Sequence, residues 1–378
     1  MRTPAVSTVR TRHRPTVAVV DLDAIRHNVR ALAPPSADVM AVVKANGYGH
    51  GDVPTARAAV DSGATWLGVA LVEEGLRLRE AGIGEPTLVL TELPPGSETQ
   101  ALAAGLTPSV YTDGGLAALA SAARAAGSRV GVHVKLDTGM HRVGLDPARA
   151  REFVQAVVGA GLEFEGLWTH FAKADQPADP FVRAQFDRFL RTATELADAG
   201  LTPRYRHVAN SAAIMGAPDT HLDMVRLGIA MYGLPPGPEL GEGADLRSAL
   251  SWRTEVAMVK RVAAGEGISY GLRYRLRRES TIATLPVGYA DGYPRALSEA
   301  GRVLIRGRRY PVAGTVCMDQ VMVDCGDDAV DPGDEVVLIG RQGHDEITAE
   351  DLARWMTTIN YEVVCGISDR VPREYVGA

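Results

Sequence analysis

The residues best suited to chemistry stand at or just after the ends of short apolar runs. Lys44 follows the run VMAVV, where burial would lower the pKa of a lysine and leave a neutral amine able to form a Schiff base. A lone lysine at such a place more often extends back to water, so its neighbours decide between the two interpretations. Other polar residues in equivalent places are Lys135, Asp137, His170, Asn210, Ser211 and Arg226.

Two segments could hold a phosphate group. The first is the glycine-rich loop 46–51 (NGYGHG) after Lys44, whose backbone N–H groups could surround an anion. Its glycines alternate and miss the dinucleotide pattern G-x-G-x-x-G. The second comprises Ser211 and the backbone N–H groups of Gly228 and Ile229, because barrels often bind phosphate after their last two strands. Asn210 and Ser211 could equally be an ordinary helix cap.

The elements that must position these residues alternate regularly. Eight apolar runs with helical segments between them predict an N-terminal (β/α)8 TIM-like barrel, with an open doubly wound sheet as the alternative. Active sites of such barrels lie at the carboxyl ends of the strands, where the polar residues stand. The expected strands are 38–44, 65–69, 87–91, 107–111, 130–136, 164–169, 205–208 and 222–225.

The pattern changes after a Pro- and Gly-rich segment, 234–244, that is typical of a linker. Short strand-like runs follow, including 254–259, with one helix at 348–356, and they predict a mainly-β C-terminal domain. The expected division is a flexible tail at 1–14, a barrel domain at 15–240 and a β-strand domain at 241–378. The early strand 16–21 could pair with either domain.

Composition excludes several classes of protein. The net charge of -6 and the lack of a long basic run argue against nucleic acid as a partner. No apolar stretch approaches the roughly 20 residues needed to cross a membrane. Cys317, Cys325 and Cys365 fit no metal or redox spacing, so we expect a cytoplasmic protein without a metal.

Three clusters in the C-terminal domain contain Tyr270, Tyr289 and Met318 among glycines and polar residues. A tyrosine has a reference pKa of about 10, so its use as a base needs a nearby cation that stabilises phenolate. Each cluster taken singly is more often turn chemistry than catalysis.

Together, these motifs resemble one family. The stretch 41–51 (AVVKANGYGHG) resembles the pyridoxal phosphate (PLP) attachment signature of alanine racemases, and further matches follow in the family's order across nearly the whole chain. They are 137–142 (DTGMHR), 169–172 (THFA), 207–212 (HVANSA), 225–233 (VRLGIAMYG), 269–271 (SYG), 288–292 (GYADG), 317–320 (CMDQ), 360–362 (NYE) and 370–373 (RVPR).

The resemblance implies a homodimer with shared active sites, in which the β domain contributes to the partner's site. Lys44 would bind PLP and act as one base, and Tyr270 from the other subunit would be the second. The implied cofactor-binding set is Lys44, Tyr48, Arg142, His170, Asn210, Ser211, Arg226, Gly228, Ile229 and Tyr361. Arg142, Met318 and Tyr289 would contact the substrate or shape its entry path.

Two positions near Arg142 need separate mention. Lys135 matches a lysine that is sometimes carbamylated in this family, and a carbamate would remove the repulsion between two cations. His141 stands where glycine is common, which could move Arg142 slightly.

The implied activity is interconversion of L- and D-alanine, supplying D-alanine for peptidoglycan. The alternatives are a racemase of broader range acting on serine or basic amino acids, a PLP-dependent decarboxylase, and a non-catalytic PLP-binding protein. A dinucleotide oxidoreductase would rest on residues 47–51 alone.

Overall fold

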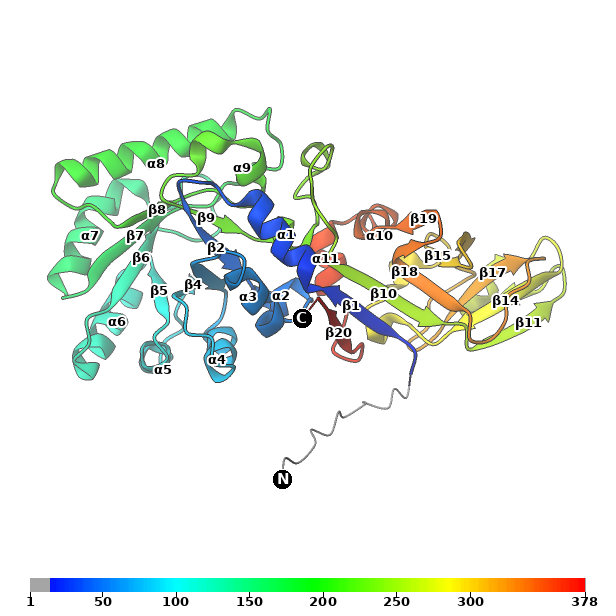
Figure 1. Cartoon of the computed structure of the whole chain (residues 1–378). Helices are drawn as coiled ribbons and strands as arrows, with labels where there is room; N and C mark the ends of the chain where they lie inside the picture. Colours follow the sequence, from blue (N-terminus) through cyan, green and yellow to red (C-terminus); the bar gives the residue numbers. More distant parts are fainter. Residues whose placement is uncertain (1–13, 378) are drawn as a thin grey trace, which may run out of the picture. The chain divides into compact units, whose positions relative to one another are not determined.

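The computed structural model describes residues 14–377, and these form two compact units (Figure 1). The barrel unit comprises Asp21–Ala249 with the described residues from Tyr375 onward, and the β unit comprises residues 14–20 with Leu250–Glu374. Of the expected tail at 1–14, residues 1–13 lie outside the described residues. Arg14 donates a hydrogen bond to Asp291 at 2.7 Å, within the β unit.

Eight parallel strands form the barrel, as predicted. Their order is β8-β7-β6-β5-β4-β3-β2-β9, and β2 pairs with both β3 and β9, so the last strand returns to the first. The strands are β2 (Asp38–Val42), β3 (Trp66–Val69), β4 (Thr87–Glu92), β5 (Thr107–Val110), β6 (Gly131–Lys135), β7 (Glu163–Trp168), β8 (Tyr205–His207) and β9 (Met224–Leu227).

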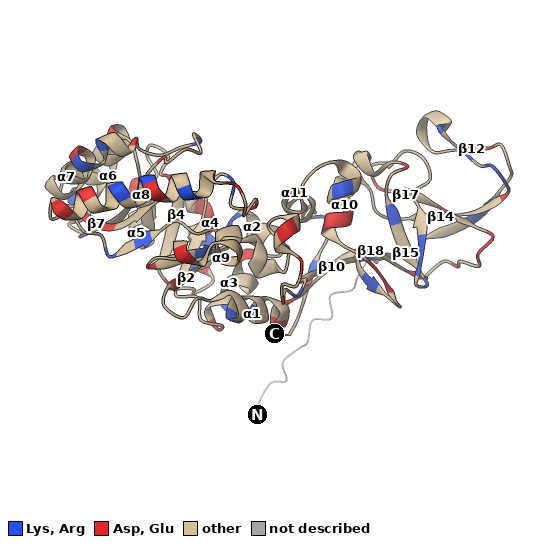
Figure 2. Cartoon of the chain, turned by 90° about the horizontal axis from the view of Figure 1, so that it is seen from above, with Lys and Arg blue, Asp and Glu red and all other residues tan. Residues whose placement is uncertain are grey.

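Helices surround these strands because each has one apolar face to bury. The helix α6 shows the local signals well: the Thr112 side chain accepts from Gly115 N at its start, and Gly127 ends it at a φ of 59°. Positions occupied by Lys, Arg, Asp and Glu recur along the ribbon of α8 (Figure 2). The helices are α1 (Leu22–Leu32), α3 (Asp52–Val60), α4 (Val72–Glu80), α5 (Glu98–Ala103), α6 (Asp113–Ala126), α7 (Ala150–Gly159), α8 (Phe181–Asp198) and α9 (Ser211–Gly216).

The first strand of the barrel, β2, ends at Val42, earlier than predicted. Lys44 then begins a left-handed turn, α2 (Lys44–Tyr48). Ala45, Asn46 and Tyr48 have φ values of 50–53°, where only glycine is unstrained. Hydrogen bonds from Gly47 N to Val43 O (2.8 Å) and from Gly49 N to Ala45 O (3.0 Å) close the turn. Backbone strain of this kind, at non-glycine residues with positive φ, is typical of functional sites.

The β unit is built mainly from antiparallel strands, as predicted. Its largest sheet has the order β16-β15-β18-β10-β1-β20, with β19 paired to β18. The strand β1 (Val17–Asp21) lies antiparallel to β10 (Leu250–Glu255), which answers the question of where the early strand pairs. The other strands are β15 (Arg302–Ile305), β16 (Arg308–Pro311), β18 (Glu335–Gln342), β19 (Asp345–Ile347) and β20 (Arg373–Val376).

Two smaller sheets and two helices complete this unit. The prediction of one strand at 254–259 is wrong in its bounds. Two strands meet this segment: β10 ends at Glu255, and β11 begins at Met258 in a different sheet. The smaller sheets contain β11 (Met258–Val262), β14 (Ser280–Leu285) and β17 (Val321–Gly326), and β12 (Gly267–Ile268) with β13 (Tyr274–Arg275). The helices are α10 (Ala349–Met356) and α11 (Asn360–Cys365).

The end of the barrel unit lies nine residues beyond the expected boundary at 240, at Ala249. The buried side chain of Asn28 explains this, because it donates to Arg247 O (2.8 Å) and Met231 O (3.0 Å) and accepts from Arg247 N (2.8 Å). The segment after the expected linker is therefore fixed to the barrel. Within residues 14–377, no helix combines the length and apolarity that a membrane span requires.

Candidate active site

The carboxyl ends of the barrel strands bring the sequence-predicted polar residues together. Lys44 follows β2, Lys135 ends β6, His170 follows β7 and Arg226 lies in β9. Burial lowers the pKa of His170 well below its usual value, and the charges of Arg226, Arg142, Lys135 and Lys44 lower it further. The basic side chains of Arg226, Arg142, Lys135 and Lys44 thus all act electrostatically on one neutral histidine, which suits an anionic ligand.

Arg226 is the most buried of these cations. Its Nη1 donates to His207 O (2.9 Å) and His207 Nδ1 (3.0 Å), and its two Nη2 hydrogens are shared among Thr169 O (2.7 Å), Val208 O (3.0 Å) and His170 Nδ1 (3.2 Å). Burial lowers the pKa of Arg226 to about 9, so the guanidinium stays charged at neutral pH. Among the described residues none accepts from its Nε–H, the fifth donor of the group.

Arg226 also fixes the tautomers of two histidines. An arginine can only donate, so the Nδ1 atoms of His170 and His207 must both be acceptors. Each neutral ring therefore carries its proton on Nε2. For His170, this leaves an N–H donor on the side of the ring that does not face Arg226.

Lys135 is buried, with its Nζ 4.2 Å from the centre of the Trp168 ring. Burial first, and then the charges of Arg226, Arg142 and Lys44, lower its pKa to about 7, although Asp137 raises it. A large fraction of this amine is neutral at physiological pH, which is the form that reacts with carbon dioxide. Carbamylation of Lys135 remains a prediction that this pKa favours.

The loop that carries Arg142 is held by Asp137. Its carboxylate accepts from Gly139 N and His141 N, both at 3.0 Å, and lies 3.2 Å from His141 Nδ1. Partial burial would raise the pKa of Asp137, but these bonds lower it. His141 has a φ of 56°, a backbone conformation that glycine adopts without strain. Arg142 itself is exposed.

Tyr48, Ser211 and Gly228 form a small cradle. Ser211 Oγ accepts from Gly228 N (2.9 Å) and Ala230 N (3.3 Å). A Cβ atom added to Gly228 would lie only 2.9 Å from the Tyr48 hydroxyl oxygen, so the glycine keeps open a space lined by two hydroxyl groups. Ile229 starts the next turn, η3 (Ile229–Tyr232), and is buried. Asn210 is the N-cap of α9, accepting from Ala213 N at 3.1 Å, so its predicted contact with a cofactor remains a prediction.

Sequence reasoning missed several residues that support this site. The Glu74 carboxylate accepts from Ala45 N (2.7 Å), Ala70 N (2.7 Å) and Leu71 N (3.1 Å), and so braces the left-handed turn after Lys44. The rings of Trp168 and His207 stack 5.6 Å apart, and Arg226 lies 4.8 Å from the Trp168 ring. An acidic residue in the first turn of α4 and a histidine ending β8 were the available signals.

The remaining predicted residues lie in the β unit. Tyr270, Met318 and Tyr289 are exposed there by 75%, 51% and 40%. Backbone contacts connect their loops: Thr315 Oγ1 donates to Tyr270 O (3.0 Å), Tyr289 N to Cys317 O (3.0 Å), and Ala290 N to Met318 O (3.0 Å). Tyr361 lies in the same unit, on α11, and is partly buried.

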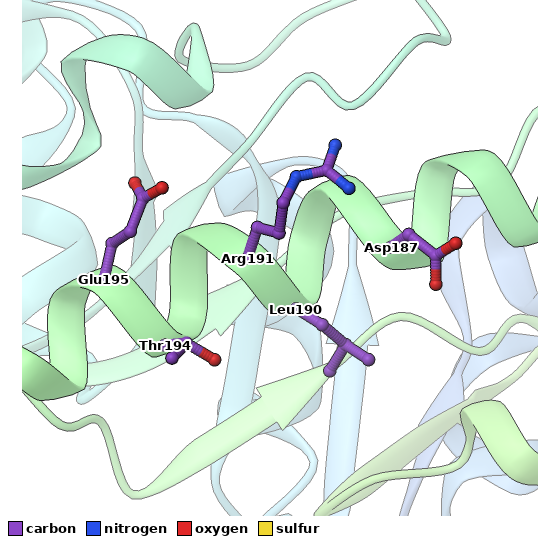
Figure 3. A pocket seen from close by; sticks show the side chains of 5 residues that line it. All are labelled: Asp187, Leu190, Arg191, Thr194 and Glu195. Carbon is purple, nitrogen blue, oxygen red and sulfur yellow. The ribbon is translucent and has the colours of Figure 1, made fainter.

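A shallow hollow of about 460 Å³ on α8 is not part of this arrangement (Figure 3). It is lined by one helix, and none of the sequence-predicted site residues lines it. Its members are Asp187, Leu190, Arg191, Thr194 and Glu195.

A parallel barrel that gathers lysine, arginine and histidine at its strand ends, beside a cradle of hydroxyl groups, defines a barrel enzyme for an anionic ligand. Residues 20–236 match the family model for the N-terminal domain of alanine racemase, and residues 249–375 match that for its C-terminal domain. The chain belongs to the alanine racemase family.

Individual relatives agree with this assignment. The chain is 53% identical over 369 residues to an alanine racemase of Symbiobacterium thermophilum, covering 96% of this chain and 98% of the relative. The crystal structure of an alanine racemase from Streptomyces lavendulae has a TM-score of 0.93 and 43% identity, covering 100% of this chain and 98% of that one. A histidine racemase from Leuconostoc mesenteroides is also similar, with a TM-score of 0.89, 30% identity, and coverage of 97% and 99%.

Proposed function

We propose that this enzyme interconverts L- and D-alanine, with PLP held by the barrel unit. The observation that carries the proposal is the cradle of Tyr48, Ser211 and Gly228, together with the contact of Arg226 with His170 and the positive charge that Lys44, Lys135 and Arg142 add near that histidine. A cationic site with hydroxyl and backbone donors suits a phosphorylated ligand.

The residues present fit PLP in chemistry as well as charge. The cradle offers the Tyr48 and Ser211 hydroxyl groups and the space at Gly228 for the phosphate, with Ile229 and Tyr361 as further predicted contacts. The Nε–H of Arg226 would be a donor for the pyridine nitrogen, and Arg142 would contact the phenolic oxygen. When bound, PLP supplies the electron sink that makes the α-hydrogen of an amino acid acidic.

Racemisation needs a proton removed from one face of Cα and returned to the other, so two bases are required. Lys44, placed by the left-handed turn, would be one of them. Tyr270 would be the other, on a loop where Ser269, Gly271 and Leu272 have φ values of 65°, 77° and 48°. Such a strained loop presents the phenol outward, at 75% exposure.

His170 would connect Arg226 to Tyr270. Because Arg226 donates to His170 Nδ1, the Nε2–H of this histidine can donate to the phenol oxygen and stabilise a phenolate. The charge of Arg226 cannot pass to the ring nitrogen as a proton at neutral pH. The electron sink that PLP supplies would therefore be weak at this site, and a weak sink would favour prompt return of the proton to Cα.

The exposed set of Tyr270, Leu272, Met318 and Tyr289 supports a homodimer in which each β unit completes the partner's site. Exposed apolar side chains that gather on one set of loops are typical of a surface that is covered in the assembly.

The substrate range depends on the residues around the entry path. Tyr289 and Met318 would limit the size of the side chain that enters, which favours alanine over larger amino acids. The similarity to a histidine racemase keeps a larger substrate as the second candidate. We also propose a cytoplasmic role in supplying D-alanine for peptidoglycan, which the odd number of cysteines (Cys317, Cys325 and Cys365) and their spacing, unlike any metal or redox motif, support.

The test is chiral analysis of L-alanine incubated with the purified protein and PLP. Approach to an equal mixture of both enantiomers, lost in Lys44→Ala and retained in Lys173→Ala, is the expected result. Retention of pure L-alanine together with racemisation of serine, histidine or lysine would contradict the substrate assignment. Failure of PLP to bind would contradict the cofactor assignment.

A further inference from the structure

Two loops of the β unit carry Tyr289 and Met318, the residues predicted to shape the entry of substrate. Tyr289 begins the turn η6 (Tyr289–Asp291), and Met318 lies between β16 and β17. A Cβ atom on Gly288 would lie only 2.3 Å from Met318 O, and Ala290 N donates to the same oxygen at 3.0 Å, so the two loops touch. Both predicted side chains are exposed, and their separation therefore depends on how the loops are held.

Arg370 forms an ion pair with each of the two loops. Its Nη2 donates to Asp319 Oδ1 at 2.7 Å, and its Nε lies 3.5 Å from Asp291 Oδ1. Asp319 directly follows Met318, and Asp291 ends the turn that begins with Tyr289. One guanidinium thus connects the two loops through a carboxylate on each.

The Asp291 end of this bridge is buried and firmly held. The carboxylate has no exposed surface, and its Oδ2 accepts from Gly288 N at 3.0 Å, which closes the turn. Its Oδ1 also accepts from Arg14 Nη2 at 2.7 Å. A buried carboxylate is costly unless it is paired and hydrogen-bonded, so these contacts together keep Asp291 in place.

The segment that carries Arg370 is attached to the same turn. Ser368 N donates to Asp291 O at 3.0 Å, and Ser368 Oγ donates to the preceding carbonyl oxygen at 2.8 Å. The Asp319 side chain, in contrast, is 58% exposed. The bond from Arg370 to Asp319 therefore ties the more exposed loop, that of Met318, to a turn that several other contacts already hold.

We infer that Arg370 is a positioning residue for substrate selection. By joining Asp291 to Asp319, it sets the distance between the two loops. The gap between Tyr289 and Met318 follows from that distance, and it limits the size of the amino-acid side chain that enters. This selectivity rests on the proposed function, whereas the joining of the loops does not.

The first arm of the test needs neither cofactor nor substrate. It measures hydrogen exchange of the Ala290 amide, which donates to Met318 O, in the PLP-free protein. Asp319→Ala and Arg370→Gln should each speed this exchange about fivefold, the upper range for an exposed ion pair. Arg370→Lys, which keeps a cation between the loops, should retain part of the protection.

The matched control is Arg308→Gln, which removes an ion pair of 2.7 Å with Asp328 elsewhere in the β unit. It should leave the exchange of the Ala290 amide unchanged. An equal increase in the control, or no increase in folded Asp319→Ala and Arg370→Gln proteins, would overturn the bridge.

The second arm compares kcat/KM for L-alanine with that for L-serine and L-α-aminobutyrate in the PLP-loaded enzyme. The preference for alanine should fall about threefold in Asp319→Ala and in Arg370→Gln, while kcat for alanine changes by less than about twofold. The double variant should fall no further than Arg370→Gln alone, because that variant already lacks the bond to Asp319.

The two arms separate the possible failures. Faster amide exchange with an unchanged preference for alanine would overturn the role of Arg370 in substrate selection. A parent enzyme that binds PLP but does not racemise alanine would refute the proposed function and the selectivity with it. The exchange measurements would still decide whether Arg370 joins the two loops.

Discussion

We expect the charge of Arg226 to set the balance between racemisation and transamination. A carboxylate facing the pyridine nitrogen would keep that nitrogen protonated, strengthen the electron sink and prolong the carbanion. We therefore predict that Arg226→Glu forms more pyruvate per racemisation event, through transamination. Pyruvate and D-alanine measured in the same reaction give the ratio, with Arg191→Glu on the outer face of α8 as the control. A ratio equal to that of the parent would contradict this account of Arg226.

Buried neutral histidines make the barrel sensitive to acid. The pKa of His133 is about 3 in the folded chain and about 6.5 in the unfolded one, so only the unfolded chain gains this proton between these values. The free energy of unfolding should fall by up to ~1.4 kcal/mol per pH unit below pH 6.5 from this residue.

Denaturant unfolding of the PLP-free protein at pH 7, 6 and 5 measures this effect. The slope with pH should decrease in His133→Gln and stay the same in His344→Gln, whose side chain is exposed. An equal slope in both variants would show that His133 does not titrate as described.

Single residues also show where sequence reasoning reaches its limit. Lys44, His170 and Arg226 could be chosen because a polar residue after an apolar run is conspicuous. His133 and Glu165 could not, because a histidine and a glutamate within a strand give no sign of the strand register that brings them 3.8 Å apart. The same holds for Glu74, whose contact with Ala45 N depends on the left-handed turn.

At the scale of elements, the loop after β9 must approach Tyr48 closely. Gly228→Ala places a methyl group 2.9 Å from the Tyr48 hydroxyl oxygen and inside the proposed phosphate cradle. We expect PLP affinity to fall about tenfold, since overpacking of this kind costs 1–3 kcal/mol. Titration of the bound cofactor's absorbance measures it, and Gly84→Ala, where an added Cβ meets nothing within 4 Å, is the matched control. Equal affinity in both variants would place the phosphate elsewhere.

The barrel strands were predictable as elements because apolar runs, helical segments and C-terminal glycines repeat with little interruption. The strands of the β unit were harder to predict from the sequence. Its strands are short, and nothing local distinguishes a strand that continues from one that leaves its sheet, as at Glu255–Met258. The left-handed turn of α2 was missed because propensity alone would not place Ala45 and Tyr48 at positive φ.

At the scale of the whole molecule, the two proposed bases belong to different units, Lys44 to the barrel unit and Tyr270 to the β unit. If each site takes Tyr270 from the partner, a mixed dimer of Lys44→Ala and Tyr270→Phe chains has one site with both residues intact. We predict about half of the parent activity in such isolated mixed dimers, and almost none in either parental variant. Lack of activity in verified mixed dimers would show that each chain completes its own site.

The pairing of β1 with β10 has a consequence for synthesis on the ribosome. The first strand of the chain is made some 230 residues before its partner, which begins at Leu250. Translation proceeds at 5–20 residues per second, so β10 is synthesised roughly 10–50 seconds after β1. During this interval the backbone groups of β1 that pair with β10 have no partner, while the barrel strands that follow β1 are already emerging from the ribosome. The order of translation and the order of assembly therefore differ, and a nascent chain halted before Leu250 would retain an unsatisfied strand edge that a chaperone could recognise.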